Sequence, residues 1–246
     1  MSGHSKWSTI KRKKGATDAK RSKVFSKIIK EITVAVKEGG EDPDSNPRLR
    51  LAISNAKGAS MPKDTMQRAI NKGSDKNAAN FFDQTFEGYL AHGIAVIIEC
   101  TTDNQQRTVS NMRAIFNKFS GNLGTNGSLS FIFDRKGIFV IPKGDLNQDD
   151  FEMEMIDGGA EDIVLEDNFF TVTTSLEDFG SMMRKLEALN IEPENAGLQR
   201  IPKETLALEL DDALKIMKVI DIFEEDDDVK SVYHTMEITE ELMNAM

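Results

Sequence analysis

The sequence feature that most constrains the fold is a change in hydrophobic periodicity near residue 80. Before it, apolar residues recur every three or four positions, the spacing that lines one face of an α-helix. After the polar stretch 74–80, short apolar runs such as 94–98 are typical of buried strands. The chain therefore divides into a helical N-terminal part and a longer part that mixes strands with helices.

The N-terminal part carries the signals of three helices. The first is expected over 18–37, because its apolar residues share one face: Val24, Phe25, Ile28, Ile29, Ile32 and Val36. Asn46 is suited to cap a second helix that has Pro47 at its first position and ends at Gly58. A third begins at Pro62 and closes at Gly73, so residues 18–73 predict a small three-helix domain.

Residues 135–202 have the element order of a ferredoxin-like fold. Turn residues at 134–137 predict a boundary, and β-α-β-β-α-β follows. The expected elements are a strand at 138–141, a helix at 148–157, strands at 162–166 and 169–174, a helix at 176–189 and an extended run at 198–201.

The segments on either side of this block are incomplete by themselves. The first predicts strands at 86–89 and 94–101, a helix at 105–119 capped by Asp103, a glycine-rich turn at 121–127 and a strand at 129–133. The second predicts a short strand near Leu206, a helix at 210–224, an acidic turn at 225–228 and a strand at 229–236. Joining the two segments into one split domain is the economical solution, since insertion of a domain at a loop tip is common.

The expected fold class is therefore α+β and multidomain. An N-terminal three-helix domain with a basic arm (1–79) is followed by two ferredoxin-like α/β domains. One is split (80–134 plus 203–246), and the other (135–202) is inserted in it.

Charge is distributed unevenly along the chain. Residues 1–30 hold ten basic residues and one acid, a charge of +9. The remaining residues carry a charge of −19, so the net charge of the chain is −10. Such asymmetry predicts a polyanionic partner. Trp7 and His4 lie among these cations, where aromatic rings are suited to stack on bases or sugars. The competing interpretation is a solvated tail.

These observations select the candidate nucleic-acid-binding residues of the N-terminal stretch, which are His4, Lys6, Trp7, Lys11, Arg12, Lys13, Lys14, Lys20, Arg21, Lys23 and Lys27. The polar run 101–108 adds two more candidates, Asn104 and Arg107, at the junction of a buried strand and a helix. Binding sites are common at such junctions. A cap at Asp103 with an exposed Arg107 explains the same run equally well.

No enzymatic chemistry is indicated. The three histidines are far apart, and neither a nucleophile elbow nor a phosphate-binding loop is present. The glycines of 121–127 follow a helix and precede a strand, the reverse of a dinucleotide site. We expect no cofactor, no metal and no small-molecule substrate.

The expected compartment is the cytoplasm. Cys100, the single cysteine, follows the apolar run 94–98 and is expected to be a buried core thiol. No membrane span or secretion signal is evident.

Several motifs resemble those of the YebC family, which includes the mitochondrial translational activator of cytochrome c oxidase. The N-terminal match comprises Ser2-Gly3-His4-Ser5-Lys6-Trp7, Ile10-Lys11, Lys14, Asp18, Arg21 and Phe25-Ser26-Lys27. Further matches are Met61-Pro62-Lys63-Asp64, Arg68 to Gly73, Glu87-Gly88-Tyr89, Thr102-Asp103-Asn104, Arg107-Thr108, Gly124, Gly127-Ser128 and Val232-Tyr233-His234. Residues 90–93 depart from the family's glycine- and proline-rich turn.

The resemblance implies three domains, no enzymatic activity and no cofactor. Members of the family are described as probable DNA-binding transcriptional regulators and as ribosome-associated factors that assist translation of proline-rich stretches. The first hypothesis is thus a non-enzymatic, nucleic-acid-binding regulator of transcription. The alternative is a translation factor that binds ribosomal RNA or tRNA, and a third possibility is a protein-interaction scaffold.

Overall fold

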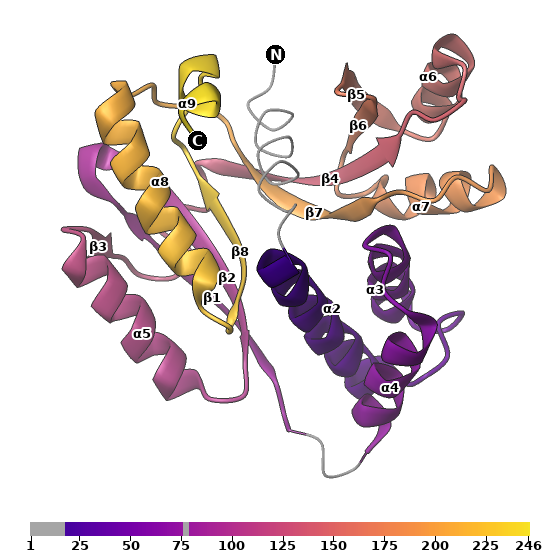
Figure 1. Ribbon diagram of the computed structural model, residues 1–246, viewed down its shortest axis with the longest axis horizontal. Helices are drawn as coiled ribbons and strands as arrows, with labels where there is room; N and C mark the ends of the chain where they lie inside the picture. The colour runs from indigo at the N-terminus through magenta and orange to yellow at the C-terminus, as the bar shows by residue number, and fades with distance from the viewer. Residues whose placement is uncertain (1–17, 76–78) are drawn as a thin grey trace. The chain divides into compact units, whose positions relative to one another are not determined.

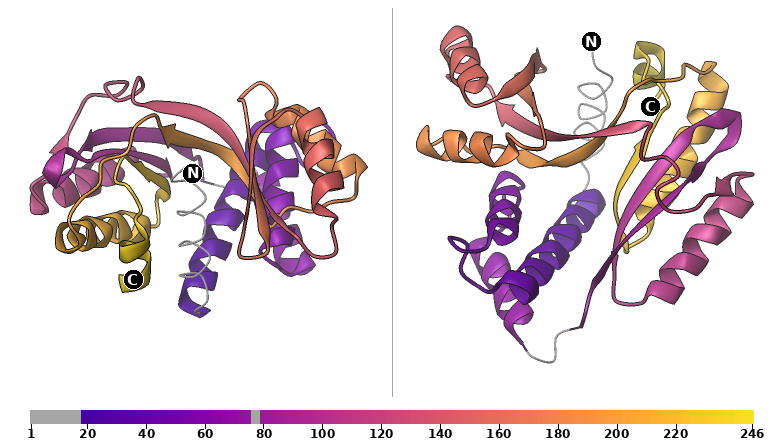
Figure 2. Two further views of the ribbon diagram at one scale, coloured as in Figure 1. Left: turned by 90° about the horizontal axis from the view of Figure 1, so that it is seen from above. Right: turned by 180° about the vertical axis from the view of Figure 1, so that it is seen from behind.

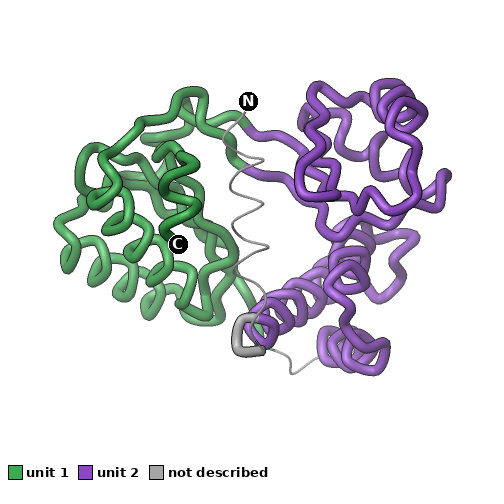
Figure 3. Tube along the Cα trace, turned by 45° about the horizontal axis from the view of Figure 1, so that its top comes forward, with its two compact units in different colours: residues 1–7, 79–134, 200–246 green, residues 8–78, 135–199 purple. Residues whose placement is uncertain are grey.

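The structure is a computed structural model that describes residues 18–75 and 79–246, with the side chains of the first range described from Arg21 onward (Figure 1). These residues form two compact units (Figure 3). Unit 1 contains 79–134 and 200–246, and unit 2 contains 18–75 and 135–199. The mixed α+β, multidomain class is confirmed. The finer division into 1–79, 80–134 plus 203–246, and 135–202 stays a prediction.

Three helices begin unit 2, as predicted: α2 (Asp18–Gly39), α3 (Pro47–Gly58) and α4 (Lys63–Ser74). Asn46 caps α3, because its side-chain oxygen accepts the Leu49 N–H at 3.0 Å. The same side chain donates to the carbonyls of Ala35 and Gly40 at 2.7 and 2.9 Å. One buried residue thus fixes the end of α2 against the start of α3.

The core of the helical part is built from small and medium apolar side chains of all three helices. Its buried members are Ile32, Ala35, Val36, Leu49, Ala52, Ala56, Met61 and Ala69. Phe25, Ile28 and Ile29 pack against this core, as the periodicity predicts. Val24 was expected on the same face but is 44% exposed. By helical spacing, Val24 lies near the edge of the apolar stripe.

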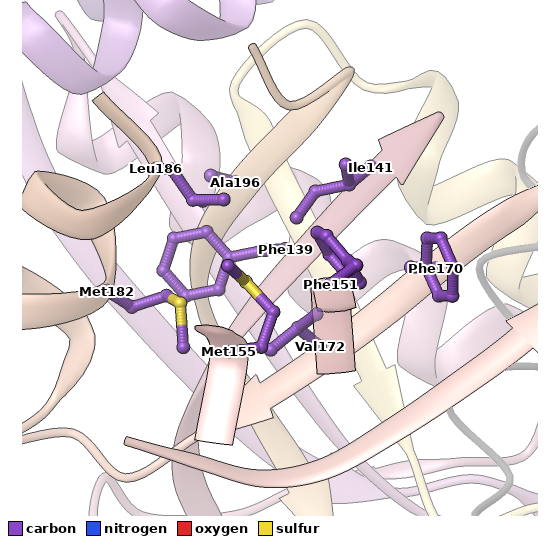
Figure 4. Close-up of a cluster of buried hydrophobic side chains, with 9 residues drawn as sticks. All are labelled: Phe139, Ile141, Phe151, Met155, Phe170, Val172, Met182, Leu186 and Ala196. Carbon is purple, nitrogen blue, oxygen red and sulfur yellow. The ribbon is translucent and has the colours of Figure 1, made fainter. Parts of the chain in front are cut away.

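The rest of unit 2 is an antiparallel sheet with two helices. Its elements are β4 (Phe133–Pro142), α6 (Gln148–Asp157), β5 (Ala160–Glu166), β6 (Phe169–Thr174), α7 (Phe179–Ala188) and β7 (Asn195–Pro202). The strand order β5-β6-β4-β7 is that of a ferredoxin-like fold, as the order of predicted elements in this block indicates. Nine buried side chains form its core, among them Phe139, Phe151 and Phe170 (Figure 4).

Two boundaries in this block differ from expectation. Residues 134–137 lie inside β4 and do not form a turn, since Gly137 pairs with Thr174 of β6. Helix α7 begins at Phe179 and not at 176. The Ser175 hydroxyl accepts the Asp178 N–H at 2.9 Å and donates to its carboxylate at 2.8 Å, which holds the preceding residues in a turn.

Unit 1 is a second four-stranded antiparallel sheet, with the order β3-β1-β2-β8. Its elements are β1 (Phe82–Tyr89), η1 (Ala91–Gly93), β2 (Ala95–Thr102), α5 (Gln105–Lys118), β3 (Asn122–Leu123), α8 (Leu210–Glu225), β8 (Val229–His234) and α9 (Glu240–Ala245). The expected strand near Leu206 is a single bridge to Met236. Helices α5 and α8 cover one face of the sheet (Figure 2). The ring centroids of Phe116 on α5 and Phe223 on α8 lie 5.1 Å apart. This spatial order matches a ferredoxin-like sheet. The difference lies in the chain order, because β1 takes the position of the strand that comes third in the chain of a ferredoxin-like fold.

The strand predicted at 129–133 is wrong. Residues 126–132 are turns, and β4 begins only at Phe133. The cause is the buried carboxylate of Glu87, which accepts the N–H groups of Gly127 at 2.8 Å and Leu129 at 2.6 Å. These bonds fold the segment back onto β1. Gly127 adopts φ +87°, a left-handed conformation that favours glycine. Cys100 is buried in the unit 1 sheet, as expected.

Candidate nucleic-acid interface

Only some of the predicted binding residues lie in the part of the chain that the structure describes. His4, Lys6, Trp7, Lys11, Arg12, Lys13 and Lys14 lie outside the described residues. Lys20 belongs to the first turn of α2, with its side chain also outside the description. Arg21, Lys23 and Lys27 lie on α2 in unit 2, and Asn104 and Arg107 lie at the start of α5 in unit 1.

Helix α2 presents a basic stripe, which we define as Lys23, Lys27 and Lys30. Steps of four and three residues place all three on one side of the helix over about 10 Å of its length. Ile28 and Ile32 pack into the core from the opposite side. Lys30 was not among the predicted binding residues, although its spacing in the sequence already placed it in this stripe.

The acidic residues of α2 do not interrupt this stripe. No acid occurs between Asp18 and Glu31. Glu31 and Glu38 both pair with Arg48 of α3, whose Nε and Nη1 lie 2.8 and 2.7 Å from the respective carboxylates. The negative charges of α2 are therefore partly compensated from α3. The N-terminal half of the helix has a concentrated positive charge.

Arg21 lies on another side of α2 than the basic stripe, beside an aromatic ring. Its guanidinium carbon lies 5.5 Å from the centroid of Phe25, one helical turn further on. This is the geometry of a cation–π contact, which limits the freedom of the arginine side chain. A pre-positioned guanidinium is suited to contact a phosphate.

Asn104 and Arg107 form a different arrangement, because both make contacts that fix the fold. Asn104 is the N-cap of α5, with its side-chain oxygen 3.0 Å from the Arg107 nitrogen. Asp103, the predicted cap, instead pairs with the Arg107 guanidinium at 2.9 Å. Asp103 and Asn104 are both of a residue type that caps helices. Asn104 caps α5, whereas the carboxylate of Asp103 binds the Arg107 guanidinium.

Arg107 is further bound to Asp228, which lies just before β8. Its Nη2 and Nε lie 2.7 and 3.2 Å from one carboxylate oxygen, and Thr108 donates to the same oxygen at 2.9 Å. Hydrogen bonds and charge from Asp228 and then Asp103 raise the pKa of Arg107 above its ordinary value. The arginine is thus fully charged, and two carboxylates already balance it.

Asp228 is a residue that the sequence analysis missed. Its side chain is only 6% exposed, although it ends an acidic run that is typical of a solvated turn. The signal available in the sequence was its place directly before the apolar strand that begins at Val229.

The described residues offer neither a metal site nor a membrane-spanning helix. Across residues 18–75 and 79–246, no group of three or more potential ligands is arranged to hold a metal ion. None of the helices in those ranges has the length and hydrophobicity needed to cross a bilayer.

Family models match nearly the whole chain. Residues 5–76 match the TACO1/YebC protein N-terminal domain, and residues 81–236 match the TACO1/YebC second and third domain. The two matches meet at the change of hydrophobic periodicity near residue 80.

Individual relatives cover between 91% and 100% of the chain. A protein of Amoebophilus asiaticus named "Probable transcriptional regulatory protein" is 51% identical over 239 residues, which are 96% of this chain and 98% of that one. A protein of Chlorobium chlorochromatii with the same name is 47% identical over 248 residues, covering 100% and 99% of the two chains. The crystal structure of the conserved hypothetical protein Aq1575 from Aquifex aeolicus is similar with a TM-score of 0.81, at 38% identity over 91% of this chain and 93% of that chain.

Proposed function

The chain belongs to the TACO1/YebC family, and from this premise we propose that it is a non-enzymatic, cytoplasmic regulator of gene expression that binds nucleic acid. Relatives named probable transcriptional regulatory proteins favour DNA as the partner. In this proposal the protein needs no cofactor and acts by occupying its target.

The observation that carries the proposal is the basic stripe of α2. Lys23, Lys27 and Lys30 display charge on a helix that is held rigidly from behind by the unit 2 core. Cations in a row neutralise successive phosphates and release their counterions, which supplies affinity without reading sequence. In the sequence, this stripe is preceded by Lys20 and by the basic arm, residues 1–17, which carries five more cations and no acid.

The proposed interface therefore consists of the arm and α2: His4, Lys6, Trp7, Lys11, Arg12, Lys13, Lys14, Lys20, Arg21, Lys23, Lys27 and Lys30. Asn104 and Arg107, in unit 1, form a separate and weaker candidate site. Their side chains cap α5 and bind Asp228, so a partner would meet an arginine whose charge is already balanced.

A second candidate is a translation factor that binds ribosomal RNA or tRNA and relieves stalling at proline-rich stretches. Trp7 and His4 favour it, because unpaired bases in RNA can stack on aromatic side chains, whereas the bases of a uniform duplex are already stacked. The two candidates share the same basic residues and differ in the shape of the polyanion.

Binding measured by fluorescence anisotropy at several salt concentrations tests the proposal. Duplex DNA and a structured RNA serve as probes for the full chain. The double variant Lys23→Gln/Lys27→Gln should weaken binding and make the slope of log affinity against log salt shallower by about two units on duplex DNA. The matched control is Lys118→Gln/Lys218→Gln, which removes the same charge from exposed lysines of unit 1.

The outcomes separate the alternatives. If the control variant lowers affinity and slope as much as the α2 variant, the interface does not include α2. Co-sedimentation with purified ribosomes, compared with binding to plasmid DNA, distinguishes the two candidate functions. A wild-type chain that binds neither would contradict both.

A further inference from the structure

Helix α6 of the inserted sheet has an unusual outer face. Phe151 and Met155 point inward and are buried in the unit 2 core (Figure 4). On the opposite side, Met153 and Ile156 are 63% and 64% exposed. They lie three residues apart, so they are neighbours on one helix face. Two large apolar side chains lie side by side in water.

Carboxylates border this pair. Five of the ten residues of α6 are acidic and none is basic: Asp149, Asp150, Glu152, Glu154 and Asp157. By helical geometry, Asp149, Asp150 and Asp157 share the outward half of the helix with Met153 and Ile156. Lys185 of α7 binds Glu154 at 2.6 Å and Asp157 at 2.8 Å, on the flank nearest α7. Negatively charged side chains therefore surround the exposed apolar pair of Met153 and Ile156.

This chemistry excludes a nucleic acid as the partner of α6. Residues 135–202 contain fifteen acidic and six basic residues, so phosphate would be repelled there. A solvated acidic helix would explain the carboxylates alone. It does not explain why two of the most exposed large apolar side chains among the described residues lie together in their midst.

We propose that the outer face of α6 is a docking surface for a basic protein segment that carries an apolar anchor. Met153 and Ile156 contact the anchor, and Asp149 and Asp150 pair with lysine or arginine side chains beside it. Methionine is flexible and polarisable, which suits a surface that accepts apolar side chains of different shape. The carboxylates steer a basic partner to the surface and repel acidic ones. This role is independent of nucleic-acid binding by α2.

The test uses the full chain and a fluorescein-labelled synthetic peptide of alternating lysine and leucine blocks that forms a basic amphipathic helix. A peptide of the same charge without leucine serves as the second probe. We expect the amphipathic peptide to bind more tightly than the all-polar one. The variant Met153→Ser/Ile156→Ser should weaken its binding by about tenfold. Both side chains are largely exposed, so the fold should not change.

Matched variants make the result specific. Leu176→Ser/Leu189→Ser removes two other exposed apolar side chains of unit 2, at 41% and 37% exposure, and should change binding less than twofold. Asp149→Asn/Asp150→Asn should weaken binding at low salt and have little effect at high salt.

Several results would overturn the proposal. They are equal binding by wild type and Met153→Ser/Ile156→Ser, equal binding of the two peptides, and no binding at all. Analytical ultracentrifugation of the wild-type chain without peptide can give one more result that would overturn the proposal. If it self-associates and Met153→Ser/Ile156→Ser abolishes the association, the occupant is a second copy of this chain.

Discussion

The side-chain amide of Asn55 on α3 forms two hydrogen bonds, both 2.8 Å long, with the backbone N–H and carbonyl of Ala196 on β7. Since β7 is an edge strand, the Ala196 N–H and carbonyl have no neighbouring strand on that side among the described residues. The Asn55 amide supplies the hydrogen bonds that water or another strand would otherwise supply. Close contact continues at Gly58, where a Cβ would lie 2.1 Å from the Glu194 carbonyl oxygen. These contacts attach the helical part of unit 2 to its sheet.

Replacement of Asn55 should therefore destabilise unit 2. Asn55→Ala leaves both Ala196 groups without their partner, and we expect a loss of about 1–3 kcal/mol in the free energy of unfolding, measured by urea denaturation. Asn71→Ala is the control, because the Asn71 side chain accepts a solvent-exposed hydrogen bond from Gln67 on α4 at 2.9 Å, and we expect its loss to change stability by less than about 0.5 kcal/mol. Equal stability of the two variants would show that the amide contributes nothing.

Asp228 should be needed for the stability of unit 1. Asp228→Ala removes the acceptor of Arg107 and Thr108 and leaves a buried hydroxyl without this bond. Because the Arg107 side chain is 47% exposed and can be rehydrated, the expected loss is about 1–3 kcal/mol, below that of a fully buried ion pair. Thermal unfolding measures it. Asp227→Ala, one residue earlier in the same acidic run, should cost much less, and a reversed order of the two would contradict the assignment.

Glu87 should control the order of the loop before β4. Glu87→Gln keeps one acceptor oxygen but replaces the other with a donor, which cannot accept from both Gly127 and Leu129. We expect faster amide hydrogen exchange at these two residues while the amides of β2 remain protected. Thr85→Ser on the same strand is a conservative control. Unchanged exchange at Leu129 would mean that other contacts fix the loop.

Asp157 should titrate at an unusually low pH. The hydrogen bond from Lys185, followed by its positive charge, lowers the pKa of this carboxyl below its ordinary value. A folded-state pKa that is depressed stabilises the fold above the ordinary value, and this contribution is lost as pH falls through the folded value. Carbon-13 NMR titration should give a lower midpoint in wild type than in Lys185→Met. Identical midpoints would exclude the ion pair in solution.

The sequence was sufficient for elements that local signals define. Helix α6 lies at its predicted bounds, and Asn46 with Pro47 marked the start of α3 correctly, since caps and periodicity act over a few residues. The strand prediction for 129–133 was wrong because Glu87, about 40 residues earlier in the chain, determines the conformation of this segment. Long-range hydrogen bonds of this kind leave no trace in a local pattern.

The same distinction holds for the candidate site. The basic stripe of α2 follows from helical spacing alone, so Lys23 and Lys27 could be assigned to one face without coordinates. The partner of Arg107 could not, because Asp228 is 121 positions away in the chain. Only the pairing of β2 with β8 brings them together.

The last prediction concerns Trp7, which separates aromatic stacking from simple charge neutralisation. Trp7→Ala leaves every charge in place. If the indole stacks on a base or sugar, affinity for structured RNA should fall by about 1–3 kcal/mol while the salt slope stays the same. Lys13→Ala should do the reverse, with a modest loss of affinity and a slope shallower by about one unit.

We expect stacking, because Trp7 is the only tryptophan of the chain and lies among cations at sequence positions before the first periodic helix. Anisotropy titrations of both variants at several salt concentrations, on duplex DNA and on structured RNA, measure the two effects separately. A larger loss on RNA than on DNA would favour the translation candidate, since unpaired bases are available there to stack. Wild-type affinity of folded Trp7→Ala for every probe would exclude the indole from recognition and leave the arm to act through its charge alone.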